Sequence, residues 1–143
     1  MRAKLWASIH NPMTTMNRPL LLSLLLMTAL PVTAATGVSA TLLDGYRSDG
    51  GNNFTAARGE QLFRARHGDM SCTSCHTDNA KATGKHAQTG KAIEALAPIA
   101  NPKRLSDPAK VEKWFKRNCN DVLKRACTSQ EKGDFVTYLL SIK

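Results

Sequence analysis

Three residues, Cys72, Cys75 and His76, form the pattern Cys-x-x-Cys-His, which is typical of covalent haem attachment. Two thiols one helical turn apart can add to the two vinyl groups on one edge of a porphyrin, and the adjacent histidine can give the iron its proximal imidazole. A thioredoxin-like redox pair would need a βαβ pattern around it, and a zinc site would need two more ligands at suitable spacing. The pattern therefore predicts one covalently bound haem c.

A secretion signal precedes this motif. Arg18 is followed by an apolar run over residues 20–32 that is too short to span a bilayer. Val32-Thr33-Ala34 then offers the small residues that precede a signal-peptidase cut. We therefore predict that residues 1–34 are a signal peptide, removed on export to the periplasm.

The remaining residues, 35–143, have the length of one small domain, and a haem would supply much of its apolar interior. We predict that they form a monohaem cytochrome c domain. A translation start at Met16 would leave this domain unchanged. A cut after Ala40 would shorten it, and an uncleaved leader would anchor it to a membrane.

The sequence is basic, with a formal net charge of +9 on the full chain. Three of these charges, at Arg2, Lys4 and Arg18, lie in the leader, which has no acidic residue, so the domain carries +6. Export argues against nucleic-acid binding, and no aromatic residues alternate with the basic ones as in single-strand binders. An acidic redox partner suits this charge better; the alternative is that the lysines form a solvated face.

Two further cysteines, Cys119 and Cys127, remain once the haem motif is set aside. In an oxidising compartment such a pair is expected to form a disulfide, here closing a short loop. By the chain-entropy estimate, a loop of this size contributes ~2.5 kcal/mol to stability. A catalytic dithiol is the alternative.

The first half of the domain is expected to contain helices and loops, with no strand alternation. A helical turn is expected at residues 42–46, and a longer helix should begin near Thr55, with Thr55 or Asn53 as its N-cap, and run through Phe63. Gly59 lies inside that helix, where glycine costs ~1 kcal/mol. Its presence predicts the close approach of another backbone.

Polar and apolar stretches alternate after the haem motif. Residues 77–90 are polar and predict an irregular segment, and residues 91–96 are expected to form a helical turn. Prolines make residues 95–104 an extended loop. Its apolar side chains are expected to pack on the haem edge; they are Ala95, Leu96, Ala97 and Ile99.

Start signals place two more helices in the second half. Ser106-Asp107-Pro108 predicts a helix capped by Asp107 that ends near Asn118 or Cys119. Thr128 and Glu131 form a capping box that begins the last helix. That helix carries core residues at helical spacing, namely Phe135, Val136, Leu139, Leu140 and Ile142.

The sixth iron ligand decides the function. Methionine is nearly excluded, because four of the five methionines lie in or before the leader and Met70 is too close to Cys72 to reach the distal side. The remaining candidates are His67 or His86, a lysine, an asparagine, or an open position. We interpret both histidines as ordinary surface residues.

Asn118 is the candidate that helical geometry singles out. At 100° per residue, Val111 and Asn118 point within about 20° of the same direction, so an amide lies in the apolar stripe of its helix. A buried amide needs partners, and a metal can serve its carbonyl oxygen. The alternative is that Asn118 caps the C-terminus of the helix, as asparagine often does.

Several motifs resemble known families. Gly59-Glu60-Gln61-Leu62-Phe63 resembles the N-terminal helix of class I cytochromes c. From about Leu42 to the end, the chain resembles the sphaeroides haem protein family of oxygen-binding cytochromes c. The matching segments are Thr89-Gly90-Lys91, Leu96-Ala97-Pro98, the run from Trp114 to Asn120, Cys127-Thr128 and Glu131-Lys132.

This resemblance implies an all-α, class I cytochrome c-like fold of short helices around one haem c. It implies that Asn118 is the distal iron ligand and leaves on reduction, and that Cys119 and Cys127 form a disulfide. A dihaem cytochrome c and a membrane cytochrome b are the implied redox partners.

Three functions follow from these observations. The first is electron transfer with binding of a diatomic gas, O2, NO or CO, at a ferrous iron that has lost Asn118, since a neutral amide oxygen suits ferric iron better. The second is a simple electron carrier with a permanent histidine or lysine ligand. The third is an enzyme, for example one that consumes NO with bound O2, which is less favoured because no distal acid or base is evident.

Overall fold

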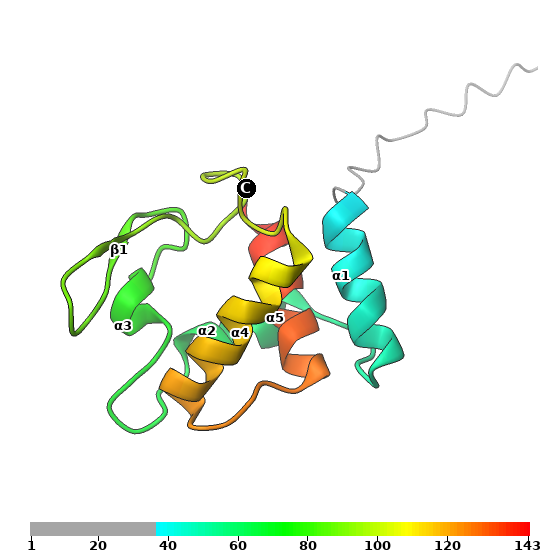
Figure 1. Cartoon of the computed structure of the whole chain (residues 1–143), viewed down its shortest axis with the longest axis horizontal. Coiled ribbons are helices and arrows are strands. Elements are labelled where there is room, and N and C mark those ends of the chain that lie inside the picture. Colours follow the sequence, from blue (N-terminus) through cyan, green and yellow to red (C-terminus); the bar gives the residue numbers. More distant parts are fainter. Residues whose placement is uncertain (1–36) are drawn as a thin grey trace, which may run out of the picture. The chain divides into compact units, whose positions relative to one another are not determined.

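The computed structural model describes residues 37–143, and the predicted leader at residues 1–34 lies outside them. Helices dominate this part of the chain, as expected (Figure 1). The elements in order are α1 (Gly37–Ser48), α2 (Ala56–Arg64), α3 (Thr73–His76), β1 (Gly84–Lys85), β2 (Ala92–Ile93), α4 (Pro108–Leu123) and α5 (Ser129–Ser141).

The crossing of α2 and α5 is the centre of the fold. Thr55 caps α2 by accepting a hydrogen bond from the Arg58 amide, so the predicted start is confirmed. A Cβ at Gly59 would collide with the backbone carbonyl of Asp134 on α5, which confirms the expected close approach. Asp134 is buried and accepts hydrogen bonds from the Thr55 amide (2.7 Å) and the Arg58 guanidinium (2.8 Å).

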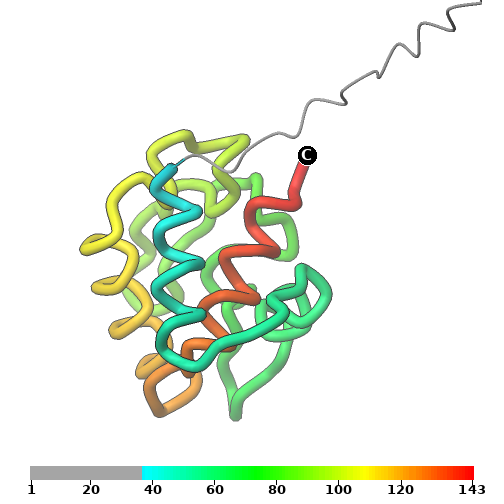
Figure 2. The backbone as a smooth tube through the Cα atoms, turned by 90° about the vertical axis from the view of Figure 1, so that its right-hand side faces the viewer, coloured from blue at the N-terminus to red at the C-terminus, as the bar shows by residue number. Residues whose placement is uncertain are grey.

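The turn expected at residues 42–46 is part of a longer helix. α1 spans 12 residues and packs along α5, as Figure 2 shows. Ser39, Leu42 and Tyr46 recur at helical spacing and are buried in this contact. The helix propensity of residues 37–48 is low because glycines stand at the start and in the middle of the segment. Packing against α5 offsets this cost.

A short hairpin replaces the irregular segment and the helical turn that were expected after the haem motif. β1 pairs antiparallel with β2, and the His86 amide donates to the Lys91 carbonyl (2.8 Å) across the turn. Gly90 allows this turn with a φ of +69°. Gly84 lies against the backbone of Cys75, so the hairpin rests on α3.

The loop over residues 95–104 contains no helix or strand, as expected. Ala95 and Ala97 are buried, but Ile99 is 64% exposed and does not line the cavity described below, so the expectation that it packs on the haem edge is wrong. The amides of Ala100 and Asn101 both donate to the Ala97 carbonyl. This tight turn directs the intervening Ile99 outward.

Both predicted starts of the last two helices are confirmed. Asp107 accepts from the Lys110 amide (3.1 Å) at the start of α4, and Thr128 and Glu131 form the capping box of α5. α4 continues to Leu123, however, beyond the predicted end. It stops only where Lys124 adopts a left-handed conformation.

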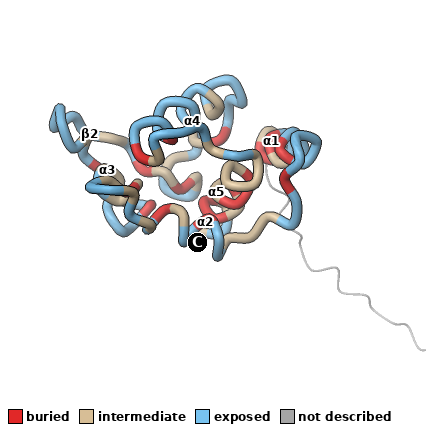
Figure 3. The backbone as a smooth tube through the Cα atoms, turned by 90° about the horizontal axis from the view of Figure 1, so that it is seen from below, coloured by how far each residue is buried: buried red, intermediate tan, exposed pale blue. Residues whose placement is uncertain are grey.

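The core follows the face that α5 turns toward α2 and α1. Figure 3 colours buried residues red, and several of them lie on these helices. Phe63 and Val136 are fully buried, and the ring of Phe63 lies 5.6 Å from that of Tyr138. Within residues 37–143, no helix has the length and apolarity needed to cross a bilayer.

Candidate functional site

The helix α3 holds the Cys-x-x-Cys-His motif in one turn. Ser71 prepares it by exchanging hydrogen bonds with Ser74: each backbone amide donates to the other residue's hydroxyl. The His76 amide donates to the Cys72 carbonyl (3.0 Å), so Cys72 and Cys75 lie one turn apart. Both thiols are free, and their spacing suits two bonds to one porphyrin edge.

A cavity of about 550 Å³ opens beside this turn. Its lining comes from α3, the hairpin, the loop over residues 95–104, α4 and α5, and is mostly apolar. Among its lining residues are Cys72, His76, Leu96, Phe115, Asn118 and Leu139. The volume lies within the range of ligand and cofactor sites, so the residues present fit a haem.

The two pKa shifts on α3 suit haem attachment. Burial, with a further contribution from the charge of Arg104, lowers the pKa of His76 to about 4, so its imidazole is neutral and can coordinate a metal. Burial raises the pKa of the Cys72 thiol to about 11. A redox-active dithiol needs the opposite shift, which argues against a thioredoxin-like pair.

The surroundings of this motif fit neither a zinc site nor a thioredoxin-like fold. In the part of the chain that the structure describes, no group of three or more His, Cys, Asp or Glu residues could hold a metal ion, so a zinc site would lack ligands. The strands there form a two-stranded antiparallel hairpin, not the parallel pair of a βαβ unit.

Asn118 lines the same cavity as His76. The expectation that it could cap α4 is wrong, because the helix continues to Leu123 and its C-cap is Lys124. Among the described residues, none forms a hydrogen bond with the side-chain amide of Asn118. Its carbonyl oxygen is therefore available to a group bound in the cavity.

His86 also borders the cavity, and neither it nor His67 is a fully exposed surface residue. Nδ1 of His86 accepts hydrogen bonds from the amides of Gln88 and Thr89 (3.3 Å each). An imidazole that binds iron through Nε2 donates from Nδ1, whereas Nδ1 of His86 accepts two hydrogen bonds, so its arrangement does not favour iron ligation. His67 does not line the cavity, and its buried Nε2 has no hydrogen-bond partner in the part of the chain that the structure describes.

Basic side chains surround the cavity. Arg104 donates from Nε to the Ala95 carbonyl and from its second terminal nitrogen to the Glu94 carbonyl, both at 2.8 Å. Burial lowers its pKa, but an arginine stays charged. Lys91, Lys103 and Lys110 also contribute to the lining. Arg117 adds a fifth positive charge, and Glu94, Asp107 and Asp121 add three negative ones, so the lining keeps a net positive charge that suits the two propionates of a haem.

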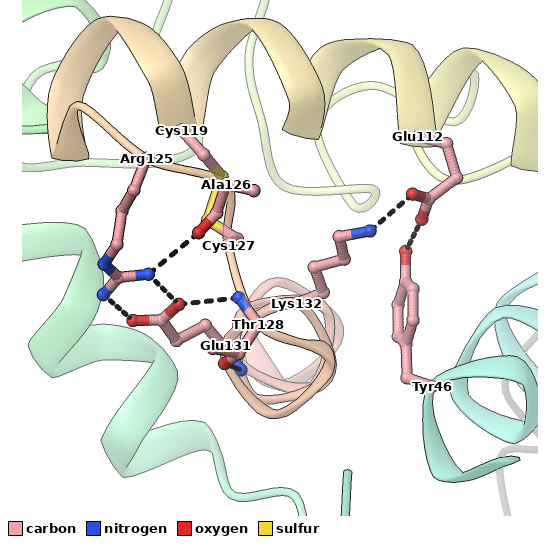
Figure 4. Close-up of a disulfide and its surroundings, with 9 residues drawn as sticks. All are labelled: Tyr46, Glu112, Cys119, Arg125, Ala126, Cys127, Thr128, Glu131 and Lys132. Atoms are coloured by element: carbon pink, nitrogen blue, oxygen red, sulfur yellow. Dashed lines mark hydrogen bonds and ion pairs between the residues drawn. A yellow bond between two sulfur atoms is a disulfide. The ribbon is translucent and has the colours of Figure 1, made fainter. Parts of the chain in front are cut away.

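Cys119 follows Asn118 directly and is placed as a disulfide partner of Cys127, with Cα atoms 5.6 Å apart (Figure 4). Within the loop they close, Arg125 forms an ion pair with Glu131 (2.6 Å). Hydrogen bonds from Arg125 lower the pKa of Glu131 to about 2. The neighbour of Asn118 is thus tied to the start of α5.

Comparisons with known proteins identify relatives of this chain. A family model described as a domain of unknown function (DUF1924) matches residues 49–139. The cytochrome c-type protein SHP of Cereibacter sphaeroides is 41% identical over 129 residues, which cover 87% of this chain and 98% of that protein. The chain belongs to the sphaeroides haem protein family.

Solved structures place it in the same group. The structure of oxidised SHP, described as an oxygen-binding cytochrome c, matches with a TM-score of 0.66 and 42% identity over 71% of this chain and 94% of that one. Oxidised cytochrome c'' of Methylophilus methylotrophus matches with a TM-score of 0.66 and 34% identity over 74% and 95% of the two chains. The fold is that of class I-like cytochromes, and the family carries a covalently bound haem c.

The sequence pointed to the motif, to Asn118 and to the pairing of Cys119 with Cys127, but not to a second tie of α4. Tyr46, Glu112 and Lys132 lie on three different helices and form one hydrogen-bonded cluster (Figure 4). No spacing rule brings together residues this far apart. The one hint in the sequence was Glu112, a carboxylate that stands among lysines in the first turns of α4.

Proposed function

We propose that this protein is a periplasmic c-type cytochrome that transfers electrons and binds a diatomic gas, O2, NO or CO, when its iron is reduced. Cys72 and Cys75 attach the haem, and His76 is the proximal ligand. Asn118 is the distal ligand in the oxidised state and leaves on reduction.

The observation that carries this proposal is the shared cavity. His76 from α3 and Asn118 from α4 both line it, and Asn118 has no capping role to explain its amide. A bound haem would supply a redox-active iron. His76 would hold that iron through its neutral imidazole and Asn118 through its amide oxygen.

The chemistry of the amide makes Asn118 displaceable. A neutral carbonyl oxygen is a hard, weak donor, so it holds ferric iron better than ferrous iron. Asn118 therefore withdraws on reduction, and the vacated position admits a small gas. The relatives support this behaviour: SHP is described as oxygen binding, and a solution structure of cytochrome c'' is described in terms of haem-ligand detachment.

Replacing Asn118 tests the proposal. Asn118→Ala should leave haem attachment intact and change the visible spectrum of the ferric protein, because the distal ligand is lost. Asn120→Ala is the matched control, since Asn120 lies on the same helix and does not line the cavity. An unchanged ferric spectrum in Asn118→Ala would contradict the assignment.

The proposed location rests on the N-terminal sequence. Residues 1–34 have the pattern of a cleaved signal peptide, and α1 begins at Gly37. A cut after Ala40 would remove the buried Ser39 from α1, so the cut after Ala34 suits the fold better. In the periplasm, Cys119 and Cys127 would be oxidised. The mass of the mature protein would locate the cut and count its thiols.

A further inference from the structure

α4 makes less backbone contact with the other elements than α1, α2 and α5 do. α5 packs closely along both α2 and α1, whereas α4 has only sparse backbone contact with the other elements. It forms one wall of the cavity and carries Asn118. Its position therefore depends on a few side-chain ties.

One tie is the pairing of Cys119 with Cys127, and the other is the Glu112 triad, formed by Tyr46, Glu112 and Lys132. Tyr46 on α1 donates its hydroxyl to Oε1 of Glu112 (2.5 Å). Lys132 on α5 donates to Oε2 of the same carboxylate (2.6 Å). Its ammonium also lies 5.5 Å from the centre of the Tyr46 ring.

Two hydrogen bonds and the burial of Tyr46 hold the Glu112 triad together. Tyr46 is buried, and burial followed by the bond to Glu112 raises its pKa, so the hydroxyl stays protonated and keeps donating. The side chain of Lys132 is 22% exposed and that of Glu112 is 44% exposed, so their ion pair is partly shielded from solvent. Phe115 packs between the rings of Tyr46 and Phe135 on the same side of α4.

The geometry of the two ties explains what they hold. Glu112 and Cys119 lie two turns apart, about 10 Å along the helix axis and within about 20° of one direction. Asn118 lies about 100° to 120° round the helix, toward the cavity. Cys119 fixes α4 near its C-terminal end, and the Glu112 triad, with Phe115 packed beside it, restrains the direction of the helix two turns earlier.

We propose that Glu112 is a positioning residue for Asn118: by fixing α4 through Tyr46 and Lys132, it sets how readily the amide leaves the iron. This inference rests on the proposed function. A weak ligand stays bound largely because its attachment keeps its effective concentration high at the iron. Loosening α4 lowers that concentration and favours the ligand-free state.

The experiment uses the full holoprotein and the variants Glu112→Gln and Tyr46→Phe. The Gln variant removes the ion pair, and the Phe variant removes one hydrogen bond while keeping the ring that packs on Phe115. Asp44→Asn is the charge-matched control, because Asp44 is an exposed carboxylate on α1 that, among residues 37–143, forms an ion pair only with Arg47. Each variant is also made in an Asn118→Ala background.

Three quantities are measured: the affinity of the ferric protein for imidazole, the reduction potential, and amide hydrogen exchange in α4. Imidazole must displace Asn118, so Glu112→Gln should raise ferric affinity about 2- to 5-fold. The reduction potential should rise by about 20 to 40 mV, because a tenfold change in an equilibrium constant corresponds to 59 mV for one electron and the expected change is 2- to 5-fold. Exchange in α4 should quicken, and Asp44→Asn should change none of these.

The variants made in the Asn118→Ala protein distinguish a failure of this inference from a failure of the proposed function. The effect of Glu112→Gln on imidazole affinity should vanish when Asn118 is already alanine. If Asn118→Ala raises the affinity but Glu112→Gln does not, or if Glu112→Gln acts equally in both backgrounds, the positioning role is wrong and the ligand role stands. If Asn118→Ala itself leaves the affinity unchanged, the proposed function fails and the positioning role with it.

Discussion

At the scale of residues, the proposed site combines a half-buried imidazole with an amide. Partial burial lowers the pKa of His76 to about 4, and the position of Asn118 within α4 leaves its carbonyl without a capping role. The residue types and the stripe containing Asn118 were readable from the sequence. The true end of α4, which excludes the cap, was not, because Lys124 gives no glycine-like stop signal.

Glu131 allows a pH prediction at this scale. Its pKa is lowered to about 2 from an ordinary 4.5, first by hydrogen bonds from Arg125. The ionised carboxylate therefore adds stability that is complete above about pH 4.5 and is lost as pH falls toward 2. Glu131→Gln keeps the cap and should cost about 1 kcal/mol at pH 7, after allowance for the half-exposed Arg125.

Urea unfolding of wild type and Glu131→Gln at pH 7 and at pH 2.5 checks this effect. The difference between the two proteins should shrink at the lower pH. A difference that stays constant would mean that the Arg125–Glu131 pair does not contribute through charge.

At the scale of elements, helix starts were predictable and helix ends were not. Thr55, Asp107 and Thr128 are strong local caps, and each begins a helix as expected. The hairpin was missed because strands of two residues are too short to show alternation. α1 was underestimated because its stability comes from contact with α5, which is distant in sequence.

The α2–α5 crossing gives a test with a matched control. Gly59→Ala would place a Cβ against the Asp134 backbone and should destabilise the protein by about 1–3 kcal/mol or more. Gly45→Ala on α1 meets nothing within 4 Å and should stabilise by about 0.5–1 kcal/mol. Equal effects of the two changes in urea unfolding would contradict the described packing.

At the scale of the whole molecule, the domain combines a small helical core with ties that are long-range in sequence. The family and the class I-like helical fold were predictable, because they rest on local motifs and helix signals. The Glu112 triad was not, since Tyr46 and Glu112 are 66 positions apart and meet only in the folded chain.

The disulfide between Cys119 and Cys127 is expected to stabilise the whole domain. Replacing both by serine should lower the free energy of unfolding by about 2.5 kcal/mol, because the unfolded chain regains the freedom of the loop. Haem attachment should persist, since Cys72 and Cys75 are separate from this pair. Guanidinium unfolding monitored by helical circular dichroism measures the loss; no change in midpoint would show that the pair is not bonded in the mature protein.

The central claim is that the distal position opens on reduction. The most direct test is the visible spectrum of the dithionite-reduced protein, recorded with and without carbon monoxide. The account predicts a high-spin ferrous spectrum that carbon monoxide converts to a low-spin adduct. A sharp low-spin ferrous spectrum that the gas leaves unchanged would contradict it, and would indicate a simple electron carrier with a permanent sixth ligand.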